Sequence, residues 1–281
     1  MGNDNMAKRL KVYKYQGAGN DFVIIDNRDG SVNLDDSQIR WLCDRRFGIG
    51  ADGMMLLSAG GEYDFTMRYF NSDGFEGTMC GNGGRCLVAF AAHRGLKKFE
   101  FTAIDGYHRA EVLEYGPYRC IVRLKMRDLL PDKKGNSPVT IYPEGYFLDT
   151  GSDHFVVFVD DVAEYDVDGE GKKWRWHERF PNGTNVNFVE IANDKIKVRT
   201  YERGVEAETF ACGTGVTASS IASFIHGAEC FTIDGERVRF EIQALGDYLA
   251  VDFIPLKEGI AFEEIWLTGP ATFVFETEVE L

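Results

Sequence analysis

The sequence has no stretch that approaches the roughly 18 consecutive apolar residues of a membrane-spanning helix. Its first ten residues also lack the apolar segment that a secretory signal needs. These absences exclude a helical membrane protein and predict a cytoplasmic one, in which thiols stay reduced. Hydrophobic residues make up 44% and charged residues 27% of the 281 residues, which is ordinary for a folded protein of about two domains.

Basic charge is also in short supply. The 31 Lys and Arg residues against 45 Asp and Glu residues give a formal net charge of −14. A nucleic-acid partner is held through its phosphates by clustered basic side chains, so this balance argues against one. It leaves a small zwitterionic substrate open.

The cysteines form neither a Cys-x-x-Cys motif nor a cysteine–histidine spacing typical of zinc sites. They are Cys43, Cys80, Cys86, Cys120, Cys212 and Cys230. Without a secretion signal, a disulfide framework is not expected either. We therefore predict free thiols and no bound metal.

The chain repeats itself once at a separation of 132 or 133 residues. The matched positions are Phe22 and Phe155, Phe47 and Phe180, Cys80 and Cys212, and Gly95 and Gly227. Each match alone is at the level of chance, but four in nearly one register are not. The sequence therefore predicts two related halves.

Charged residues and two prolines interrupt the pattern at residues 127–138, which predicts a linker between the halves. Within each half, segments such as 64–70 and 195–201 alternate polar and apolar residues and predict strands. The main helical pattern follows the cysteine motif of each half, over 87–94 and 216–226. Because these helices carry few polar residues, we expect each to be buried against a curved sheet.

Cys80 and Cys212 each directly precede a Gly-x-Gly motif and a predicted helix. A helix N-terminus presents N–H groups and about half a positive charge, which lowers a thiol pKa from its free value of about 8.5 and can hold a carboxylate. Glycines there allow a ligand to approach the backbone. A pseudo-twofold relation between the halves would place the two thiols on opposite faces of one substrate carbon. One thiolate would remove the α-proton and the opposite thiol would return a proton, which predicts stereoinversion without pyridoxal phosphate.

Other interpretations of the cysteines and glycines were weighed against this one. Free cysteines are often buried structural residues, and we interpret the remaining four in that way: Cys43, Cys86, Cys120 and Cys230. Residues 48–53 match G-x-G-x-x-G, but no helix fits after them, which argues against a dinucleotide-binding site.

Several longer motifs resemble those of diaminopimelate epimerases. They are Gly17-x-Gly19-Asn20-Asp21-Phe22, Phe70-Asn71-x-Asp73-Gly74, Cys80-Gly81-Asn82-Gly83-Gly84-Arg85-Cys86, Asn185-Val186-Asn187, Tyr201-Glu202-Arg203-Gly204 and Glu208-Thr209-x-Ala211-Cys212-Gly213-Thr214-Gly215. The resemblance runs in order through residues 10–281. The two cysteine motifs together with Glu-Arg-Gly are its most specific part.

The resemblance implies an α+β fold of two pseudo-symmetric domains, each a curved, mostly antiparallel sheet wrapped around a central helix. On this basis we place the first domain at residues 9–126, joined by the C-terminal strand at about 264–281, and the second at 127–263. The implied activity is the interconversion of LL- and meso-2,6-diaminopimelate, in lysine and peptidoglycan precursor biosynthesis. The implied enzyme is a cytoplasmic homodimer that uses no cofactor.

The resemblance also implies roles for individual residues. Cys80 and Cys212 are the acid–base pair, and His154 and Glu202 tune the two thiols. The residues implied in substrate binding are Asn20, Asn71, Gly81, Asn82, Asn185, Glu202, Arg203, Gly213 and Thr214. From position alone, Asn71 is equally explained as a turn former before Gly74, and Arg203 as part of a surface ion pair.

The sequence departs from the family pattern at a few positions. Ser152 and Asp153 precede the histidine, where an asparagine and a proline are common, and Gly53 stands where some members have glutamine. These changes affect the expected details of substrate contact. A tyrosine often found on the last strand is replaced by Phe275.

A proline or hydroxyproline racemase is the nearest alternative, because it also uses two cysteines. Those enzymes typically have histidine after the first Cys-Gly, where this chain has Asn82, and proline before the second cysteine, where it has Ala211. A binding protein that has lost catalysis is a second alternative. The presence of both thiols together with Glu202 and Arg203 argues against it.

Overall fold

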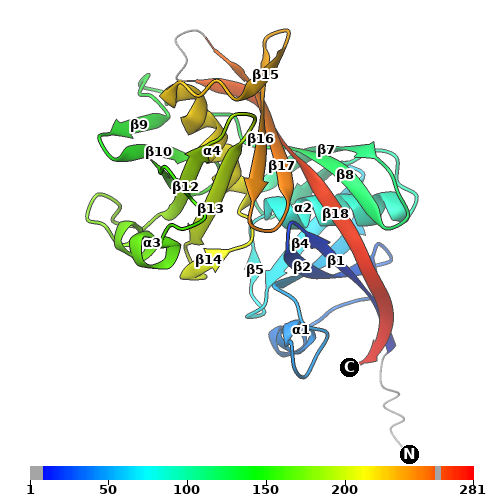
Figure 1. Cartoon of the computed structure of the whole chain (residues 1–281). Coiled ribbons are helices and arrows are strands. Elements are labelled where there is room, and N and C mark those ends of the chain that lie inside the picture. The colour runs from blue at the N-terminus through cyan, green and yellow to red at the C-terminus, as the bar shows by residue number, and fades with distance from the viewer. Residues whose placement is uncertain (1–8, 257–260) are drawn as a thin grey trace, which may run out of the picture. The chain divides into compact units, whose positions relative to one another are not determined.

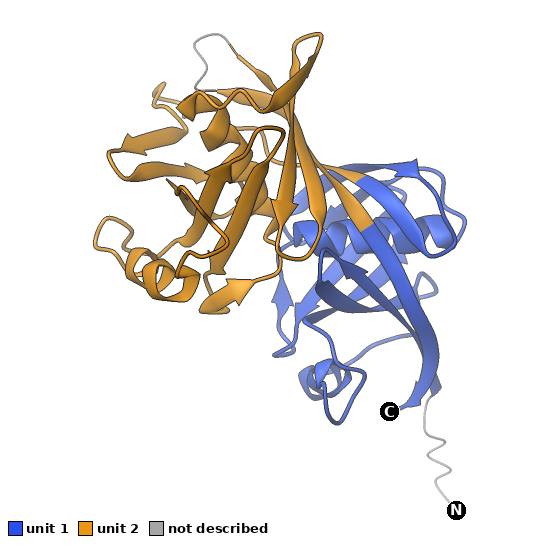
Figure 2. Ribbon diagram, in the orientation of Figure 1, with its two compact units in different colours: residues 1–122, 271–281 blue, residues 123–270 orange. Residues whose placement is uncertain are grey.

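The computed structural model describes residues 9–256 and 261–281, so residues 1–8 and 257–260 lie outside the description. The chain divides into two compact units, which Figure 2 shows in different colours. Unit 1 holds the chain up to Val122 together with Ala271–Leu281, and unit 2 holds Arg123–Pro270. Unit 1 is therefore completed by the C-terminal end of the chain.

Unit 1 is a mostly antiparallel sheet with two helices (Figure 1). Its strands are β1 (Arg9–Gly17), β2 (Asn20–Asn27), β3 (Gly53–Ala59), β4 (Phe65–Asn71), β5 (Glu76–Gly77), β6 (Glu100–Ala103), β7 (Gly106–Glu114) and most of β8 (Arg119–Lys125). Its helices are α1 (Asp36–Cys43) and α2 (Gly81–His93). β1 pairs antiparallel with β2, β2 parallel with β3, β3 antiparallel with β4, and β4 parallel with β6.

Unit 2 has the same kind of architecture. Its strands are β9 (Val139–Tyr142), β10 (Gly145–Asp149), β11 (Asp153–Phe158), β12 (Asn185–Ile191), β13 (Ile196–Glu202), β14 (Ala207–Thr209), β15 (Phe231–Asp234), β16 (Arg237–Ala244), β17 (Tyr248–Pro255) and the first part of β18 (Phe262–Glu280), whose second part belongs to unit 1. Its helices are α3 (Val167–Arg175) and α4 (Gly213–His226).

The same series of strand pairings occurs in both units. In unit 2, β10 pairs antiparallel with β11, β11 parallel with β12, β12 antiparallel with β13, and β13 parallel with β16. The registers agree as well, because Phe22 lies opposite Gly53 in unit 1 and His154 lies opposite Asn185 in unit 2. His154 thus takes the position of Phe22, at a separation of 132 residues. The strands are related by one residue fewer than the sequence match of Phe22 with Phe155 indicates.

Helix α2 is the buried centre of unit 1. Every residue from Gly81 to Ala92 is buried, and the helix contacts β1, β2, β3 and β7. The ring of Phe90 lies 4.9 Å from that of Tyr13, between centroids. Small and apolar side chains on all sides allow this enclosure, as expected for a helix without a solvent face.

Helix α4 holds the same place in unit 2, where it contacts β10, β11, β12, β13, β16 and β17. It buries four hydroxyl groups, and each donates a hydrogen bond to the carbonyl four residues earlier: Thr217, Ser219, Ser220 and Ser223. A buried hydroxyl without a partner would be costly, so these bonds allow a partly polar helix to be enclosed. The helix ends at Gly227, whose φ of 89° lies in the left-handed region that favours glycine.

The predicted α+β fold, a mostly antiparallel sheet around one helix in each half, is confirmed. The sequence pattern did not indicate α1 and α3, which have eight and nine residues and mostly polar, exposed surfaces. Each begins after a capping aspartate: Asp35 accepts from the backbone N–H groups of Ser37 and Gln38, and Asp166 from that of Gly169. These caps were the available signal.

The packing of α2 generates a prediction about stability. Phe90→Ala removes a fully buried ring, so we expect the free energy of unfolding to fall by about 3–5 kcal/mol. Tyr118→Ala, at a ring that is 67% exposed, is the control and should change it by less than about 0.5 kcal/mol. Urea denaturation followed by circular dichroism measures both. Equal effects would contradict the assignment of α2 as the core of unit 1.

Candidate active site

The two thiols singled out by the sequence occupy the same place in their units. Cys80 is the N-cap residue of α2 and Cys212 that of α4, both with extended backbone. Both are partly exposed, and neither forms a disulfide. The first turn of each helix, with its N–H groups that have no helical partner, therefore begins directly after a thiol.

The second glycine of each motif is required by packing. A Cβ at Gly83 would lie 3.2 Å from the sulfur of Met55 and 3.5 Å from the ring of Phe22. A Cβ at Gly215 would lie 2.4 Å from the side-chain oxygen of Asn187, closer than real Cβ atoms approach. These glycines let each helix start close to its sheet. The sequence analysis assigned them only to the approach of a ligand.

In unit 1, Cys80 lies beside two asparagines from the predicted binding set. Its Sγ is 3.7 Å from Oδ1 of Asn20, which also accepts from Nδ2 of Asn82 at 3.4 Å. The amide nitrogen of Asn20 donates to Asp52 at 2.5 Å. The carboxyl of Asp52 therefore orients the amide that faces the thiol.

Asp52 belongs to an ionic network that the sequence analysis missed. Arg45 bridges Asp52 at 2.6 Å and Asp21 at 2.7 Å, and Lys14 contacts Asp21 at 2.7 Å. Burial alone would raise the pKa of Asp21, but hydrogen bonds from Arg45 and Lys14 hold it well below its usual range. The adjacency of Asp21 to Asn20 in the motif was the one available signal.

In unit 2, Cys212 begins a chain of polar contacts. Its Sγ lies 3.4 Å from Oγ1 of Thr214, which lies 2.8 Å from Nε2 of His154. Nδ1 of His154 lies 3.0 Å from the amide nitrogen of Asn187. His154 is fully buried, and burial together with the nearby charge of Arg203 lowers its pKa to about 3. The imidazole is therefore neutral across the physiological range.

Arg203 and Asn185 form a second cluster in unit 2. Asn185 Oδ1 accepts from the backbone N–H of Arg203 at 2.8 Å, and its amide nitrogen donates to the Oγ of Ser152 and the carbonyl of Asp153, both at 2.9 Å. The guanidinium of Arg203 contacts the Asp153 carboxylate at 3.2 Å and the Ser152 hydroxyl at 3.1 Å. The two residues that depart from the family pattern thus hold Arg203.

The remaining predicted residues lie at strand ends. Glu202 ends β13, and its carboxylate accepts from the hydroxyl of Thr209 at 2.9 Å. Asn71 ends β4, where its carbonyl accepts from the N–H of Gly74 at 2.9 Å. Asn71 therefore does form the turn that its position before Gly74 suggested. Its role in binding stays a prediction.

The other four cysteines have the surroundings of packing residues. All are buried, and burial raises the pKa of each: Cys43, Cys86, Cys120 and Cys230. That of Cys43 reaches about 12. Such thiols are poor nucleophiles and bases at neutral pH.

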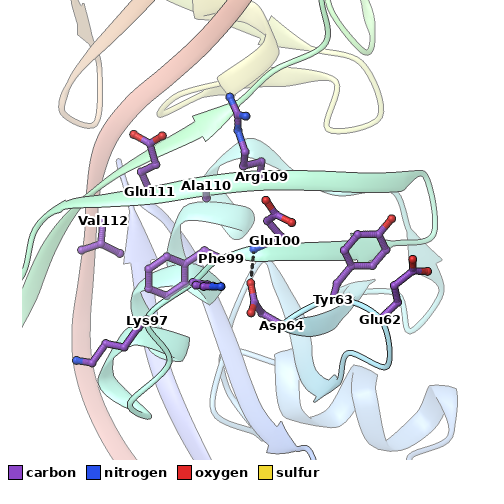
Figure 3. A pocket seen from close by; sticks show the side chains of 11 residues that line it. Glu62, Tyr63, Asp64, Lys97, Phe99, Glu100, Arg109, Ala110, Glu111 and Val112 are labelled. Carbon is purple, nitrogen blue, oxygen red and sulfur yellow. Dashed lines mark hydrogen bonds between the residues drawn. The ribbon is translucent and has the colours of Figure 1, made fainter.

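A surface cavity of about 640 Å³ lies elsewhere in unit 1, along β7 (Figure 3). Charged side chains of both signs line it, among them Asp64, Lys97, Glu100 and Arg109. Its lining residues include neither Cys80 nor the asparagines beside it. Across the described residues, no group of three or more His, Cys, Asp or Glu side chains is placed to hold a metal ion. No helix in that part of the chain is long and apolar enough to cross a membrane.

Comparison with solved structures shows that the fold is shared. A phenazine biosynthesis protein of the PhzF family from Bacillus anthracis matches with a TM-score of 0.71 at 15% identity, over 98% of this chain and 100% of that one. A hydroxyproline epimerase from Agrobacterium vitis matches with a TM-score of 0.63 at 13% identity, over 98% and 94%.

Comparison of sequences is more specific. A family profile described as diaminopimelate epimerase matches residues 12–117 and 146–248. The diaminopimelate epimerase of Flavobacterium psychrophilum is 44% identical, over 96% of this chain and all of that protein. That of Chlorobaculum tepidum is 43% identical, over 94% and 99%. With matched cysteines at the starts of two buried helices, the chain belongs to the diaminopimelate epimerase family.

Proposed function

We propose that this protein is an isomerase that interconverts LL- and meso-2,6-diaminopimelate without a cofactor, in lysine and peptidoglycan precursor biosynthesis. The observation that carries the proposal is the placement of Cys80 and Cys212 as N-cap residues of equivalent buried helices. The relatives named diaminopimelate epimerase, similar over almost the whole chain, support the same substrate.

The proposed reaction uses the two thiols as a two-base pair. One cysteine, as the thiolate, takes the α-proton of the substrate, and the other, as the thiol, gives its proton to the opposite face of the same carbon. The reacting carboxylate rests against the N–H groups of Gly81 and Asn82 and of Gly213 and Thr214. Those groups stabilise the negative charge that develops as the α-proton leaves.

The distant end of the substrate is assigned to the remaining polar residues. Asn20 and Asn82 lie beside Cys80, while Asn185 and Arg203 form one connected cluster. A planar guanidinium can hold a carboxylate in one orientation, so Arg203 is assigned to the distal carboxylate, with Asn71 and Asn185 contributing amide contacts. Contacts to Ser152 and Asp153 reduce the freedom of the Arg203 side chain before substrate binds.

Two further residues are assigned to adjust the thiols. His154 reaches Cys212 through Thr214, and Glu202 is held by the hydroxyl of Thr209. We also propose a homodimer in the cytoplasm, as the family resemblance implies, with no nucleic-acid or membrane partner. Sedimentation of the purified protein tests the dimer.

The two-base assignment predicts that either thiol is indispensable. Cys80→Ala or Cys212→Ala should lower the rate of epimerisation by at least about 10³-fold, because inversion needs an acid and a base on opposite faces. Cys230→Ala, at a buried packing position, is the control and should retain activity near that of the wild type. Loss of circular dichroism from LL-diaminopimelate and deuterium uptake from solvent measure the rate. Normal turnover by Cys80→Ala would refute the mechanism.

The assignment of Arg203 predicts the range of substrates. LL- and meso-diaminopimelate should interconvert, while lysine, proline, glutamate and the DD isomer should react about 10⁴-fold more slowly, because they leave polar groups of the site unpaired. Arg203→Lys keeps the charge but loses the planar fork, so kcat/KM should fall sharply. Arg179→Lys, which alters an ion pair with Glu144 in the same unit, is the control. Proline turnover that rivals that of diaminopimelate would favour the racemase alternative.

A further inference from the structure

The atom that touches each sulfur differs between the two units. In unit 1, the Sγ of Cys80 faces Oδ1 of Asn20 at 3.7 Å. An amide oxygen carries no hydrogen, so this contact is a hydrogen bond only when the sulfur carries a proton. The contact therefore favours the thiol form of Cys80.

The orientation of the Asn20 amide is fixed from both ends. Its nitrogen donates to the carboxylate of Asp52 at 2.5 Å, and Asp52 in turn forms an ion pair with Arg45 at 2.6 Å. Its oxygen accepts from Asn82, whose own oxygen accepts from Arg85 at 2.9 Å. A flipped amide would place oxygen against carboxylate and nitrogen against nitrogen. The oxygen must therefore face Cys80.

In unit 2, the Sγ of Cys212 faces a hydroxyl, Oγ1 of Thr214, at 3.4 Å. A hydroxyl can donate or accept, so its direction depends on its other partner. That partner is Nε2 of His154 at 2.8 Å. If Nε2 carries the proton, the Thr214 oxygen accepts from it, and the hydroxyl hydrogen is directed to the sulfur.

Asn187 decides which nitrogen of His154 carries the proton. The amide nitrogen of Asn187 lies 3.5 Å from the carbonyl oxygen of Phe155, and its oxygen accepts from the hydroxyl of Thr200 at 3.0 Å. The same nitrogen lies 3.0 Å from Nδ1 of His154. Nδ1 thus accepts, and because the ring is neutral its single proton resides on Nε2.

The result is a chain of donors that ends on the sulfur of Cys212. Asn187 donates to His154, His154 donates to Thr214, and Thr214 donates to Cys212. A hydrogen bond donated to sulfur stabilises the thiolate over the thiol. The contact at Cys212 is therefore opposite in sign to that at Cys80.

The strand register shows that only one unit carries this polar pair at these positions within the described residues. His154 and Asn187 of unit 2 correspond to Phe22 and Met55 of unit 1, in equivalent places on paired parallel strands. The repeat thus supplies equivalent helix ends to both thiols. The buried imidazole and amide are additions in unit 2.

Charged groups of both signs surround each thiol, so they do not determine the difference. Those of unit 1 are Asp21, Asp52 and Asp105 with Lys14, Arg45, Arg85 and His108, and those of unit 2 are Asp153 and Glu202 with Arg203. Most are engaged with one another in ion pairs. The atoms in direct contact with sulfur are left to set the preference.

We propose that the resting enzyme holds Cys212 as the thiolate and Cys80 as the thiol, with Asn187 and Asn20 as the residues that position the two contacts. This inference rests on the proposed function. In the first proton transfer, the α-proton passes to the Cys212 sulfur and the Cys80 proton passes to the carbon. The enzyme then carries the opposite protonation and returns to the resting state by exchanging protons with water.

Alkylation of the free enzyme tests the proposal. Iodoacetamide reacts with thiolates, so its rate at each cysteine, measured by peptide mass spectrometry over roughly pH 5 to 10, gives each ionisation midpoint. A charge-assisted hydrogen bond is equivalent to about one to two pKa units, so the midpoint of Cys212 should be lower than that of Cys80 by at least that much. Equal midpoints, or the reverse order, would overturn the proposal.

Matched variants separate the hydrogen-bond chain from general packing. Thr214→Val and Asn187→Leu should raise the midpoint of Cys212 by about one unit and leave that of Cys80 unchanged. Thr217→Val is the control, because its buried hydroxyl bonds to the carbonyl of Gly213 on the same helix. An equal shift in Thr217→Val, or none in Thr214→Val, would show that the chain does not set the thiol state. Thr214→Val decides this even if Asn187→Leu does not fold.

The labelling needs no substrate, so its outcome is independent of catalysis. If both alanine variants of the thiols are inactive while the wild-type midpoints coincide, the proposed function stands and this inference fails. If Cys80→Ala inverts diaminopimelate normally, the proposed function fails, and the midpoints still decide the resting state of the thiols.

Discussion

The rest of the site depends on the burial of two helices from their first residue. Because α2 and α4 are enclosed by their sheets, their first turns cannot shift relative to the strands that carry the other polar groups. The thiols at Cys80 and Cys212 are therefore held by the core of each unit. Loops do not position them. Strand ends then supply Asn20, His154 and Arg203 at fixed distances from the helix starts.

Enclosure of a helix start also explains why a glycine follows at the third position after each cysteine. At Gly215 the side-chain oxygen of Asn187 occupies the space that a Cβ would need. The same asparagine contacts His154, so the close approach of α4 to β12 brings a polar strand residue into the surroundings of the thiol. In unit 1 the corresponding space holds the sulfur of Met55, and the contact is apolar.

Local pattern was sufficient to predict the fold and the two thiols. Helix starts, alternating strands and the repeat are encoded in neighbouring residues, so the sequence identified α2, α4 and the strands around them. It could not identify contacts that depend on strand register. Asn20 and Asp52 are 32 residues apart and meet because β2 and β3 pair in parallel. His154 and Thr214, 60 residues apart, meet through the packing of α4 on β11.

The departures at Ser152 and Asp153 show how a site can change without losing its frame. Each contacts the guanidinium of Arg203, and each is also tied to Asn185. A hydroxyl and a carboxylate at these positions give Arg203 partners in the absence of substrate. An arginine held in this way keeps its planar fork in one orientation, although its nearest anion is a competitor for the incoming carboxylate. The affinity for substrate is therefore a difference between two ion pairs, and Asp153 is the residue that links the departure from the family pattern to substrate recognition.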